Sequence, residues 1–176
     1  MDYQFDLADE SVLEAVYALI DRRIDWMDAV GIRQWNVTDY WGVYPKEHYV
    51  EQMRHDRLFV LKRAADGAVV GTAVLYETDP RWPDGETASA YYVHHFAASP
   101  DEKGVGAVLL RHLEEYTRQK GKAALRLDCA DGNTRLNRYY REKGYSPCGT
   151  CVDGLYRGIL QEKPLVEKET TPCSVK

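Results

Sequence analysis

The feature that most constrains this chain is a pair of glycines, Gly104 and Gly106, at the start of a helix-forming run. Apolar side chains recur after them at three- and four-residue steps, from Val105 to Tyr116, which predicts an amphipathic helix. Glycine lowers helix stability, so its use here predicts either a turn that needs its backbone freedom or a ligand that approaches the backbone closely. Because the first N–H groups of a helix are unpaired and its dipole favours negative charge, phosphate is the ligand expected there.

Two established phosphate-binding patterns do not fit these glycines. The G-x-x-x-x-G-K-[ST] loop is absent, and Leu109 stands where the dinucleotide pattern G-x-G-x-x-G needs its third glycine. A turn glycine followed by an ordinary helix cap is the alternative interpretation.

The remaining hydrophobic pattern predicts a mixed α/β sheet in one domain, residues 1–163, followed by a polar tail, residues 164–176. A segment rich in aromatic residues follows the first helix. In chain order the expected elements are a helix over 10–30, a short helix over 45–53, a hairpin over 57–78 that turns at "ADG", a buried strand over 88–99, the helix described above, a strand over 121–130, a short helix over 131–144 and a final hairpin over 145–161.

Composition excludes several classes of protein. The 176 residues, 44% hydrophobic and 29% charged, are enough for one domain with a substantial core. The net charge of −5 and the lack of a basic stripe argue against a nucleic-acid partner. No apolar run approaches the roughly 20 residues that cross a bilayer, and the acidic N-terminal segment is unlike a secretory signal, so we expect no membrane partner and a cytoplasmic location.

The four cysteines do not form a recognisable site. Cys148 and Cys151 form a C-x-x-C pair, but no second pair or nearby histidine completes a zinc site. A redox pair would open a helix, whereas this pair precedes a predicted turn and strand. We therefore expect free thiols, Cys129 and Cys173 included, and no metal.

Residues 91–145 resemble the core of the GCN5-related N-acetyltransferases (GNAT), the acyl-CoA-dependent family. The resemblance consists of the strand that ends in "AASP", the "KGVG" turn, the long helix, the next strand and the segment "NTRLNRYYREKGY". Asn133 precedes Tyr140 by seven positions, as in the family, and Gly144-Tyr145 follow. The family's turn usually carries Gln or Arg three residues before the first glycine, where this chain has Asp101. An acid there weakens diphosphate binding unless it points to solvent and Lys103 compensates.

The resemblance implies the GNAT fold: a mixed, mostly antiparallel central sheet with a V-shaped splay between two parallel strands, flanked by helices. It implies acetyl-CoA as co-substrate and direct transfer of the acetyl group to a primary amine, without an acyl-enzyme. Backbone groups at the end of the strand would bind the pantetheine arm, and the amides of the turn would bind the diphosphate. The residues so placed are Phe96, Ala97 and Ala98 on the strand, Lys103, Gly104, Val105, Gly106 and Ala107 at the turn, and Asn133 and Tyr140 on the next helix.

Three residues are candidates for the chemistry. The amide of Phe96 would polarise the thioester carbonyl, and Tyr140 would protonate the leaving thiolate. His94 is a candidate general base, with Glu77 acting through water as the alternative. Strand alternation predicts Tyr92, His94 and Phe96 on one face.

Each assignment has a structural alternative. Tyrosines such as Tyr140 commonly fill cores, Asn133 can cap its helix, and a strand histidine is often only hydrogen-bonded.

The acceptor is not fixed by these residues. An aromatic cluster near the acceptor cleft would either cage a cationic amine or pack a helical lid: Trp26, Trp35, Tyr40, Trp41 and Tyr44. Asp21, Asp25 and Asp28 nearby would suit a polyamine or a basic peptide. We favour a small-molecule amine; a protein N-terminal or lysine acetyltransferase and a non-catalytic CoA-binding module are the alternatives. A homodimer is left open.

Overall fold

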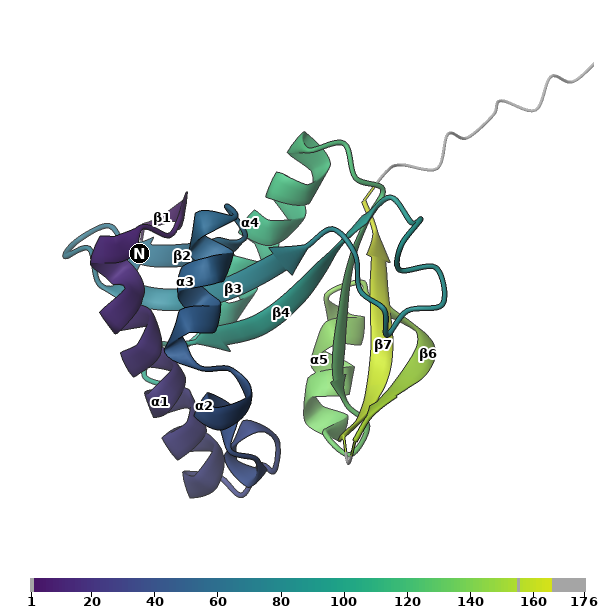
Figure 1. Ribbon diagram of the computed structural model, residues 1–176, viewed down its shortest axis with the longest axis horizontal. Helices are drawn as coiled ribbons and strands as arrows, with labels where there is room; N and C mark the ends of the chain where they lie inside the picture. Colours follow the sequence, from purple (N-terminus) through teal and green to yellow (C-terminus); the bar gives the residue numbers. More distant parts are fainter. Residues whose placement is uncertain (1, 155, 166–176) are drawn as a thin grey trace, which may run out of the picture.

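The fold is known from a computed structural model that describes residues 2–154 and 156–165. A seven-stranded sheet in the order β1-β2-β3-β4-β5-β7-β6 runs through the molecule (Figure 1). Every neighbouring pair is antiparallel except β4 and β5, which are parallel. The strands are β1 (Tyr3–Leu7), β2 (Leu58–Arg63), β3 (Val69–Tyr76), β4 (Ala90–Ala98), β5 (Ala124–Ala130), β6 (Ser146–Asp153) and β7 (Tyr156–Pro164).

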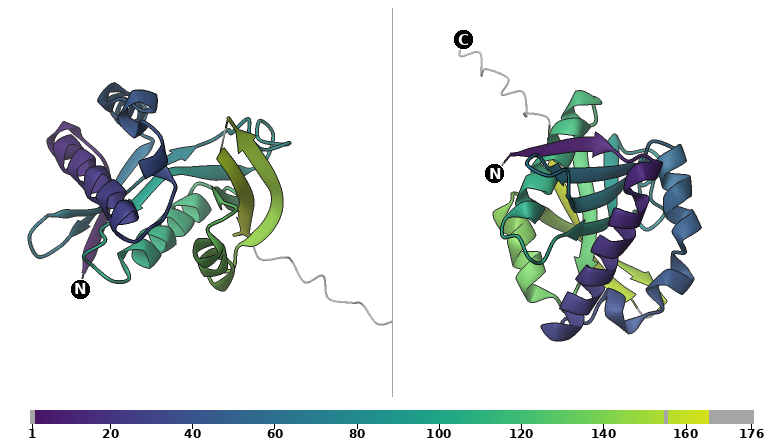
Figure 2. Two further views of the ribbon diagram at one scale, coloured as in Figure 1. Left: turned by 90° about the horizontal axis from the view of Figure 1, so that it is seen from below. Right: turned by 90° about the vertical axis from the view of Figure 1, so that its left-hand side faces the viewer.

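Helices cover both faces of the sheet (Figure 2). The α1 side and the α4 side have separate apolar cores, one centred on Val16, Ile20 and Val60 and the other on Leu109, Leu113 and Leu125. The helices are α1 (Leu13–Ala29), α2 (Tyr40–Val43), α3 (Lys46–Arg54), α4 (Val105–Gln119) and α5 (Thr134–Glu142), with 3-10 turns at Glu10–Val12 and Trp35–Val37.

The predicted mixed sheet and the predicted order of elements from α1 to β7 are confirmed. Strand β1 was not predicted, because its short run "YQFDL" carries an acid and is only half buried. It forms because residues 3–7 pair in full register with residues 59–63 of β2, a contact that is remote in sequence. Of the expected C-terminal tail, Pro164 ends β7 and Leu165 packs into the core, and the rest lies outside the described residues.

The splay expected from the resemblance is present. Strands β4 and β5 pair only where Ala90–Tyr92 lie beside Ala124–Arg126. Beyond Tyr92 and Arg126 the two strands diverge, β5 continuing beside β7 and β4 beside β3 (Figure 1). The last residues of β4 therefore have a partner strand on one side and an open edge on the other.

A β-bulge in β4 overturns the predicted side-chain alternation. Val74 pairs with His94 and Thr72 pairs with Ala97, so two residues, His95 and Phe96, oppose Ala73 alone. His95 adopts a φ of 50°, in the left-handed region that is uncommon outside glycine. As a result Phe96 packs with the core on the α4 side instead of sharing a face with His94, and the rings of His94 and His95 lie near each other, centroids 6.2 Å apart.

Two further observations concern the described residues. No helix in the described part of the chain is long and apolar enough to cross a membrane. Cys129, Cys148 and Cys151 are free thiols, as predicted, and Cys173 lies outside the described residues.

Candidate active site

The two glycines of the turn differ in whether the protein's own structure requires glycine there. Gly104 precedes α4 with a φ of 88°, so the turn itself needs its backbone freedom. Gly106 has no such φ, and a Cβ there would meet Ala98 Cβ at 3.6 Å and Phe96 Cε1 at 3.8 Å, which are ordinary contacts. Neither strain nor crowding within the protein requires glycine at position 106.

The N-terminus of α4 offers a group of unpaired amides. Within the described ranges, the N–H groups of Lys103, Gly104, Val105 and Gly106 have no protein acceptor, as the first turn of a helix leads one to expect. Ala107 differs, because its amide donates to the carbonyl of Gly104 at 3.0 Å. These four donors at the positive end of a helix dipole fit a diphosphate.

The open edge of β4 lies beside this turn. Ser99 donates its amide to the Val70 carbonyl of β3 at 2.8 Å, and backbone amides alternate in direction along a strand. The amide of Ala98 therefore points away from β3, toward the side that β5 has left, and Phe96 precedes it in the bulge. Ala97 is fully buried on the α1 side and its backbone faces β3, so it is not brought to the open edge.

Asp101 does not lie free beside the turn. Its carboxylate forms an ion pair with Arg22 of α1, Nη1 to Oδ2 3.7 Å, and its side chain is 74% exposed. Solvent screens a pair of this kind, and Arg22 partly offsets the acid's charge. The departure from the family's usual residue is therefore accommodated by a cation from another helix.

Tyr140 lies on α5, which begins at the splay. It is 5% exposed, packs in the core on the α4 side and, within the described residues, makes no hydrogen bond through its hydroxyl. Burial, followed by nearby Cys129, raises the pKa of Tyr140 well above its usual 10, so the hydroxyl stays protonated near neutral pH. It is thus available as a proton donor. Tyr139 packs against the same core, as expected.

Asn133 caps α5. Its Oδ1 accepts a hydrogen bond from the Leu136 amide at 3.1 Å, so the capping role is confirmed and the other lone pairs of the side chain remain for a ligand. Asn137, which was not predicted, anchors the helix from within the core: its Nδ2 donates to the Ala130 carbonyl, and its Oδ1 accepts from Gln161.

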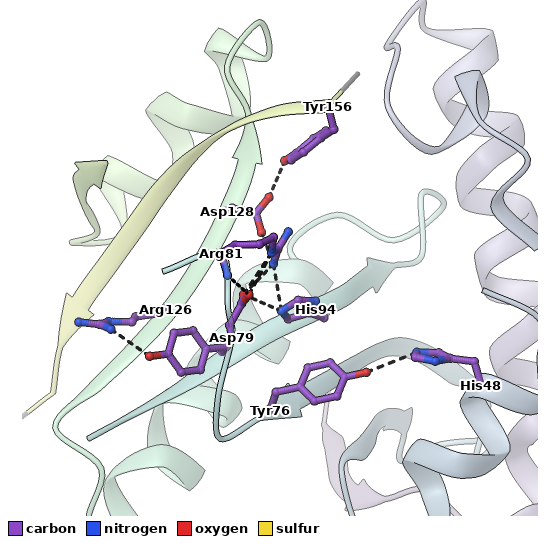
Figure 3. A network of polar contacts seen from close by, with 9 residues as sticks. His48, Tyr76, Asp79, Arg81, His94, Arg126, Asp128 and Tyr156 are labelled. Carbon is purple, nitrogen blue, oxygen red and sulfur yellow. Dashed lines mark hydrogen bonds and ion pairs between the residues drawn. The ribbon is translucent and has the colours of Figure 1, made fainter. Parts of the chain in front are cut away.

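His94 belongs to a network of charged side chains that crosses the splay (Figure 3). His94 Nε2 lies 3.0 Å from Asp79 Oδ2, and Arg81 Nη2 lies 2.8 Å from the same oxygen. Arg81 Nη2 also contacts Asp128 of β5 at 2.8 Å. Burial raises the pKa of Asp79, but the hydrogen bonds from His94 and Arg81 outweigh it and hold that pKa well below its ordinary value.

The carboxylate of Asp128 accepts a second hydrogen bond, from the Tyr156 hydroxyl of β7 at 2.6 Å. Arg81 thus connects the divergent strands β4 and β5 just beyond the point where their backbone pairing ends. Asp79 and Arg81 lie in the loop of residues 77–89, which was predicted only as a polar loop, and no short-range sequence signal marks them as part of the site.

His95 lies in a separate aromatic environment. Its Nδ1 is 2.9 Å from the Tyr40 hydroxyl, and its ring contacts those of Tyr44 and His48 at centroid distances of 4.5 and 5.1 Å. Burial, followed by the charges of His94 and His48, lowers the pKa of His95 well below its usual 6.5. The imidazole is therefore neutral near pH 7.

Four members of the predicted aromatic cluster, Trp35, Tyr40, Trp41 and Tyr44, pack together. Tyr40 is buried and contacts the rings of Trp35, Trp41 and Tyr44 at centroid distances of 5.0 to 5.5 Å. Trp26 is separate and stacks with Arg23. Of this cluster, Tyr44 is the member whose ring contacts His95 most closely.

Glu77, the alternative relay for the base, points elsewhere. Its carboxylate pairs with Lys122 Nζ at 2.9 Å at the surface and makes no contact with His94. No cluster of three or more His, Cys, Asp or Glu side chains within the described ranges has the geometry to hold a metal ion.

A turn with four unpaired amides, an open strand edge and a protonated tyrosine are the features expected of an acyltransferase of the GNAT class. Residues 19–145 match the profile described as the Acetyltransferase (GNAT) family. The chain belongs to this family.

Solved structures of other proteins have a similar fold, and one protein matches part of the sequence. An acetyltransferase of the GNAT family from Listeria monocytogenes has a TM-score of 0.75 at 20% identity, over 93% of this chain and 95% of its own. The PaiA N-acetyltransferase from Thermoplasma acidophilum, solved with coenzyme A, has a TM-score of 0.72 at 18% identity, over 93% and 99%. Streptothricin acetyltransferase from Streptomyces lavendulae is 32% identical over 71 residues, 40% of this chain and 37% of that protein.

Proposed function

We propose that this chain transfers an acetyl group from acetyl-CoA to a small-molecule primary amine by direct attack of the amine on the thioester. The observation that carries the proposal is the separation of β4 from β5 beside four unpaired amides at the start of α4. The amides of Lys103, Gly104, Val105 and Gly106 would bind the diphosphate, and the edge of β4 at Phe96 and Ala98 would bind the pantetheine arm as a neighbouring strand would.

The thioester supplies an activated acyl group; the side chains and amides of the protein supply position and protons. The Phe96 amide would donate to the carbonyl oxygen as it gains negative charge. Tyr140, held protonated by burial, would donate a proton to the departing sulfur, and His94 would accept the proton that the amine loses.

The cysteines support direct attack over an acyl-enzyme. Cys129, the thiol near Tyr140, is 1% exposed and donates to Asn137 Oδ1 at 3.1 Å. Burial, followed by the charge of Asp128, raises its pKa to about 12. Because the thiolate is the nucleophilic form, this thiol is a poor nucleophile near neutral pH.

A partial sequence match favours a small-molecule acceptor. The chain is 32% identical over 71 residues to streptothricin acetyltransferase, which is named for a small molecule.

Calorimetry with coenzyme A and a thiol-release assay test the proposal. We expect coenzyme A to bind, and thiol release from acetyl-CoA to depend on a small-molecule amine. Peptides with a free N-terminus or an internal lysine form the comparison panel. Faster release with the peptides would indicate a protein acetyltransferase, binding without release would indicate a CoA-binding module, and absence of binding would overturn the assignment of the turn.

A further inference from the structure

His94 and His95 are consecutive in sequence, yet the bulge brings both rings to the α1 side of β4. The protein anchors each ring through a different nitrogen. His94 is bound at Nε2 and His95 at Nδ1, and the described residues offer no hydrogen bond to the other nitrogen of either ring. Which atom each ring presents to a substrate follows from where the hydrogens of these bonds must lie.

For His94, the hydrogen-bond partner determines which ring nitrogen carries the hydrogen. Asp79 is a carboxylate and accepts hydrogen bonds only, so Nε2 of His94 must carry a hydrogen. Arg81 Nη2 lies 3.0 Å from the same nitrogen, but its two hydrogens have closer acceptors in Asp79 Oδ2 and Asp128 Oδ1, each at 2.8 Å, so it has none left to donate to His94. In the neutral ring the Nδ1 atom of His94 is then unprotonated, and its lone pair is free.

For His95 the hydrogen positions follow from a chain of two tyrosines. Tyr49 is fully buried, and its hydroxyl contacts that of Tyr40, 2.5 Å away. Tyr49 has no other acceptor in the described part of the chain, so its hydrogen is satisfied only if it donates to Tyr40. Tyr40 must then donate to Nδ1 of His95, and the neutral ring carries its hydrogen on Nε2.

We propose that Asp79 and the Tyr49–Tyr40 chain fix the two histidines so that His94 presents a free lone pair at Nδ1 and His95 presents a free N–H at Nε2. His94 is then the proton acceptor for the amine, and His95 is a hydrogen-bond donor that orients a polar group of the acceptor. Asp79 and Tyr40 are positioning residues that act through the rings. This assignment of roles rests on the proposed function.

The proton balance is complete. The amine nitrogen forms a bond to the acyl carbon as the carbon–sulfur bond breaks, and the amine proton passes to His94 Nδ1. The sulfur leaves with the Tyr140 proton as a thiol. His94 then loses its proton to water and Tyr140 regains one from water, so the enzyme returns to its starting state.

The charged and titratable groups around the two rings lie on the loop of residues 77–89, on β5, on α3 and on β4 itself. Asp79 and Arg81 face His94 from the loop of residues 77–89, with Asp128 of β5 behind Arg81, while His48 approaches from α3. His95 is affected by His94, His48 and Arg81. The uncharged groups that contact the rings are Tyr76 on β3, Tyr40 and Tyr44 in and after α2, and Tyr49 on α3.

Nitrogen-15 NMR of the imidazole rings tests the hydrogen positions directly, without acetyl-CoA or an acceptor. In the wild-type protein near neutral pH, both rings should be protonated at Nε2 and unprotonated at Nδ1. Asp79→Asn should give mixed tautomers at His94 and leave His95 unchanged, and Tyr40→Phe should do the reverse. A wild-type spectrum with hydrogen on Nδ1 of either ring would overturn the proposal, even if a variant failed to fold.

The dependence of kcat/KM on pH tests the roles. His94→Gln should lower kcat/KM by about 10²-fold or more and remove the acid limb of the pH profile. Asp79→Asn should move that limb to lower pH, because the imidazolium loses its carboxylate, whereas Tyr40→Phe should lower the rate without moving it. An acid limb that persists in His94→Gln would refute His94 as the base. Failure of the proposed acetyl transfer would instead show as no turnover with correct ring tautomers.

Discussion

Replacing Tyr140 by phenylalanine separates a catalytic hydroxyl from a structural one, because loss of a structural hydroxyl lowers stability and loss of a catalytic one does not. The change removes one oxygen from a side chain that is 5% exposed and makes no hydrogen bond within the described residues. A matched control lies five residues on. Tyr145 is 2% exposed, its ring lies 5.6 Å from that of Tyr140, and its hydroxyl donates to Glu114 Oε1 at 3.2 Å.

The expected changes in stability follow from these contacts. Among the described residues, the buried side-chain atoms that lack a hydrogen-bond partner do not include the Tyr140 hydroxyl, which therefore reaches solvent. Tyr140→Phe should then change the free energy of unfolding by no more than about 0.5 kcal/mol. Tyr145→Phe removes a hydrogen bond to a carboxylate, worth about 1.5–3 kcal/mol. For a chain of this size that loss lowers Tm by about 3–12 °C.

The expected change in rate is the reverse. General acid catalysis contributes about 10²–10⁴-fold, and a thiolate with a pKa near 8.5 leaves readily, so we expect the lower end of that interval. Tyr140→Phe should therefore lower kcat about 10²-fold, equivalent to about 2.7 kcal/mol in the activation free energy. Because burial raises the pKa of Tyr140 above 10, this deficit should be the same at every pH from about 6 to 9.

Thermal unfolding, calorimetry with coenzyme A and single-turnover thiol release measure the three quantities. Coenzyme A affinity should stay within about twofold in Tyr140→Phe, and Tyr145→Phe should keep its chemical rate once corrected for the folded fraction. An unchanged single-turnover rate in Tyr140→Phe would remove the hydroxyl from the mechanism. A fall in Tm equal to that of Tyr145→Phe would show that the hydroxyl is structural.

Two further predictions concern the turn and the buried tyrosines. Gly106→Val should weaken coenzyme A binding at least tenfold by calorimetry, with little change in Tm. Gly104→Ala is strained at a φ of 88°, so it should lower stability by about 1 kcal/mol and largely keep the affinity for coenzyme A. The opposite ranking of the two variants would contradict the roles assigned to the two glycines. Burial raises the folded-state pKa of Tyr49 and Tyr145 above the unfolded value of about 10, so their stabilisation is complete below pH 10 and is lost as pH rises above it. In an alkaline titration, the last increase in tyrosinate absorbance should therefore coincide with the loss of the circular dichroism signal, and complete ionisation before unfolding would contradict this burial.

The sequence predicted the local part of the site well. The "KGVG" turn, the helix after it and the Asn133 cap depend on residues within a few positions of one another, and the structure places them as expected. The pattern did not distinguish the two glycines, because the need for a positive φ at Gly104 and the open approach to Gly106 become visible only in three dimensions.

The bulge in β4 was beyond reach of pattern analysis. Period-two alternation predicted Phe96 on the face of His94, and nothing in "YYVHHFAAS" marks a histidine with positive φ. The strain at His95 is offset by its hydrogen bond to Tyr40 and its ring contacts with Tyr44 and His48, which come from a different part of the chain.

The charged network was also unpredictable from sequence, for a topological reason. Arg81 and Asp128 are remote in sequence and meet because the loop of residues 77–89 crosses the place where β4 and β5 separate. His94 was predicted as a base from its residue type alone; that it faces Asp79 could not be deduced without this crossing.

The same loop buries Trp82, 5% exposed, against Tyr92, Ala124 and Leu160, and its Asp84 binds Arg126. This one loop thus covers apolar side chains on one half of the sheet, and it also carries the carboxylate that orients His94. Natural variation in this loop is then restricted for two reasons, because a substitution that alters the pair of Asp79 and His94 also disturbs the packing beneath the loop. We expect laboratory evolution toward new acceptors to change residues of α2 and α3 first. Substitutions in this loop should appear only together with stabilising substitutions elsewhere.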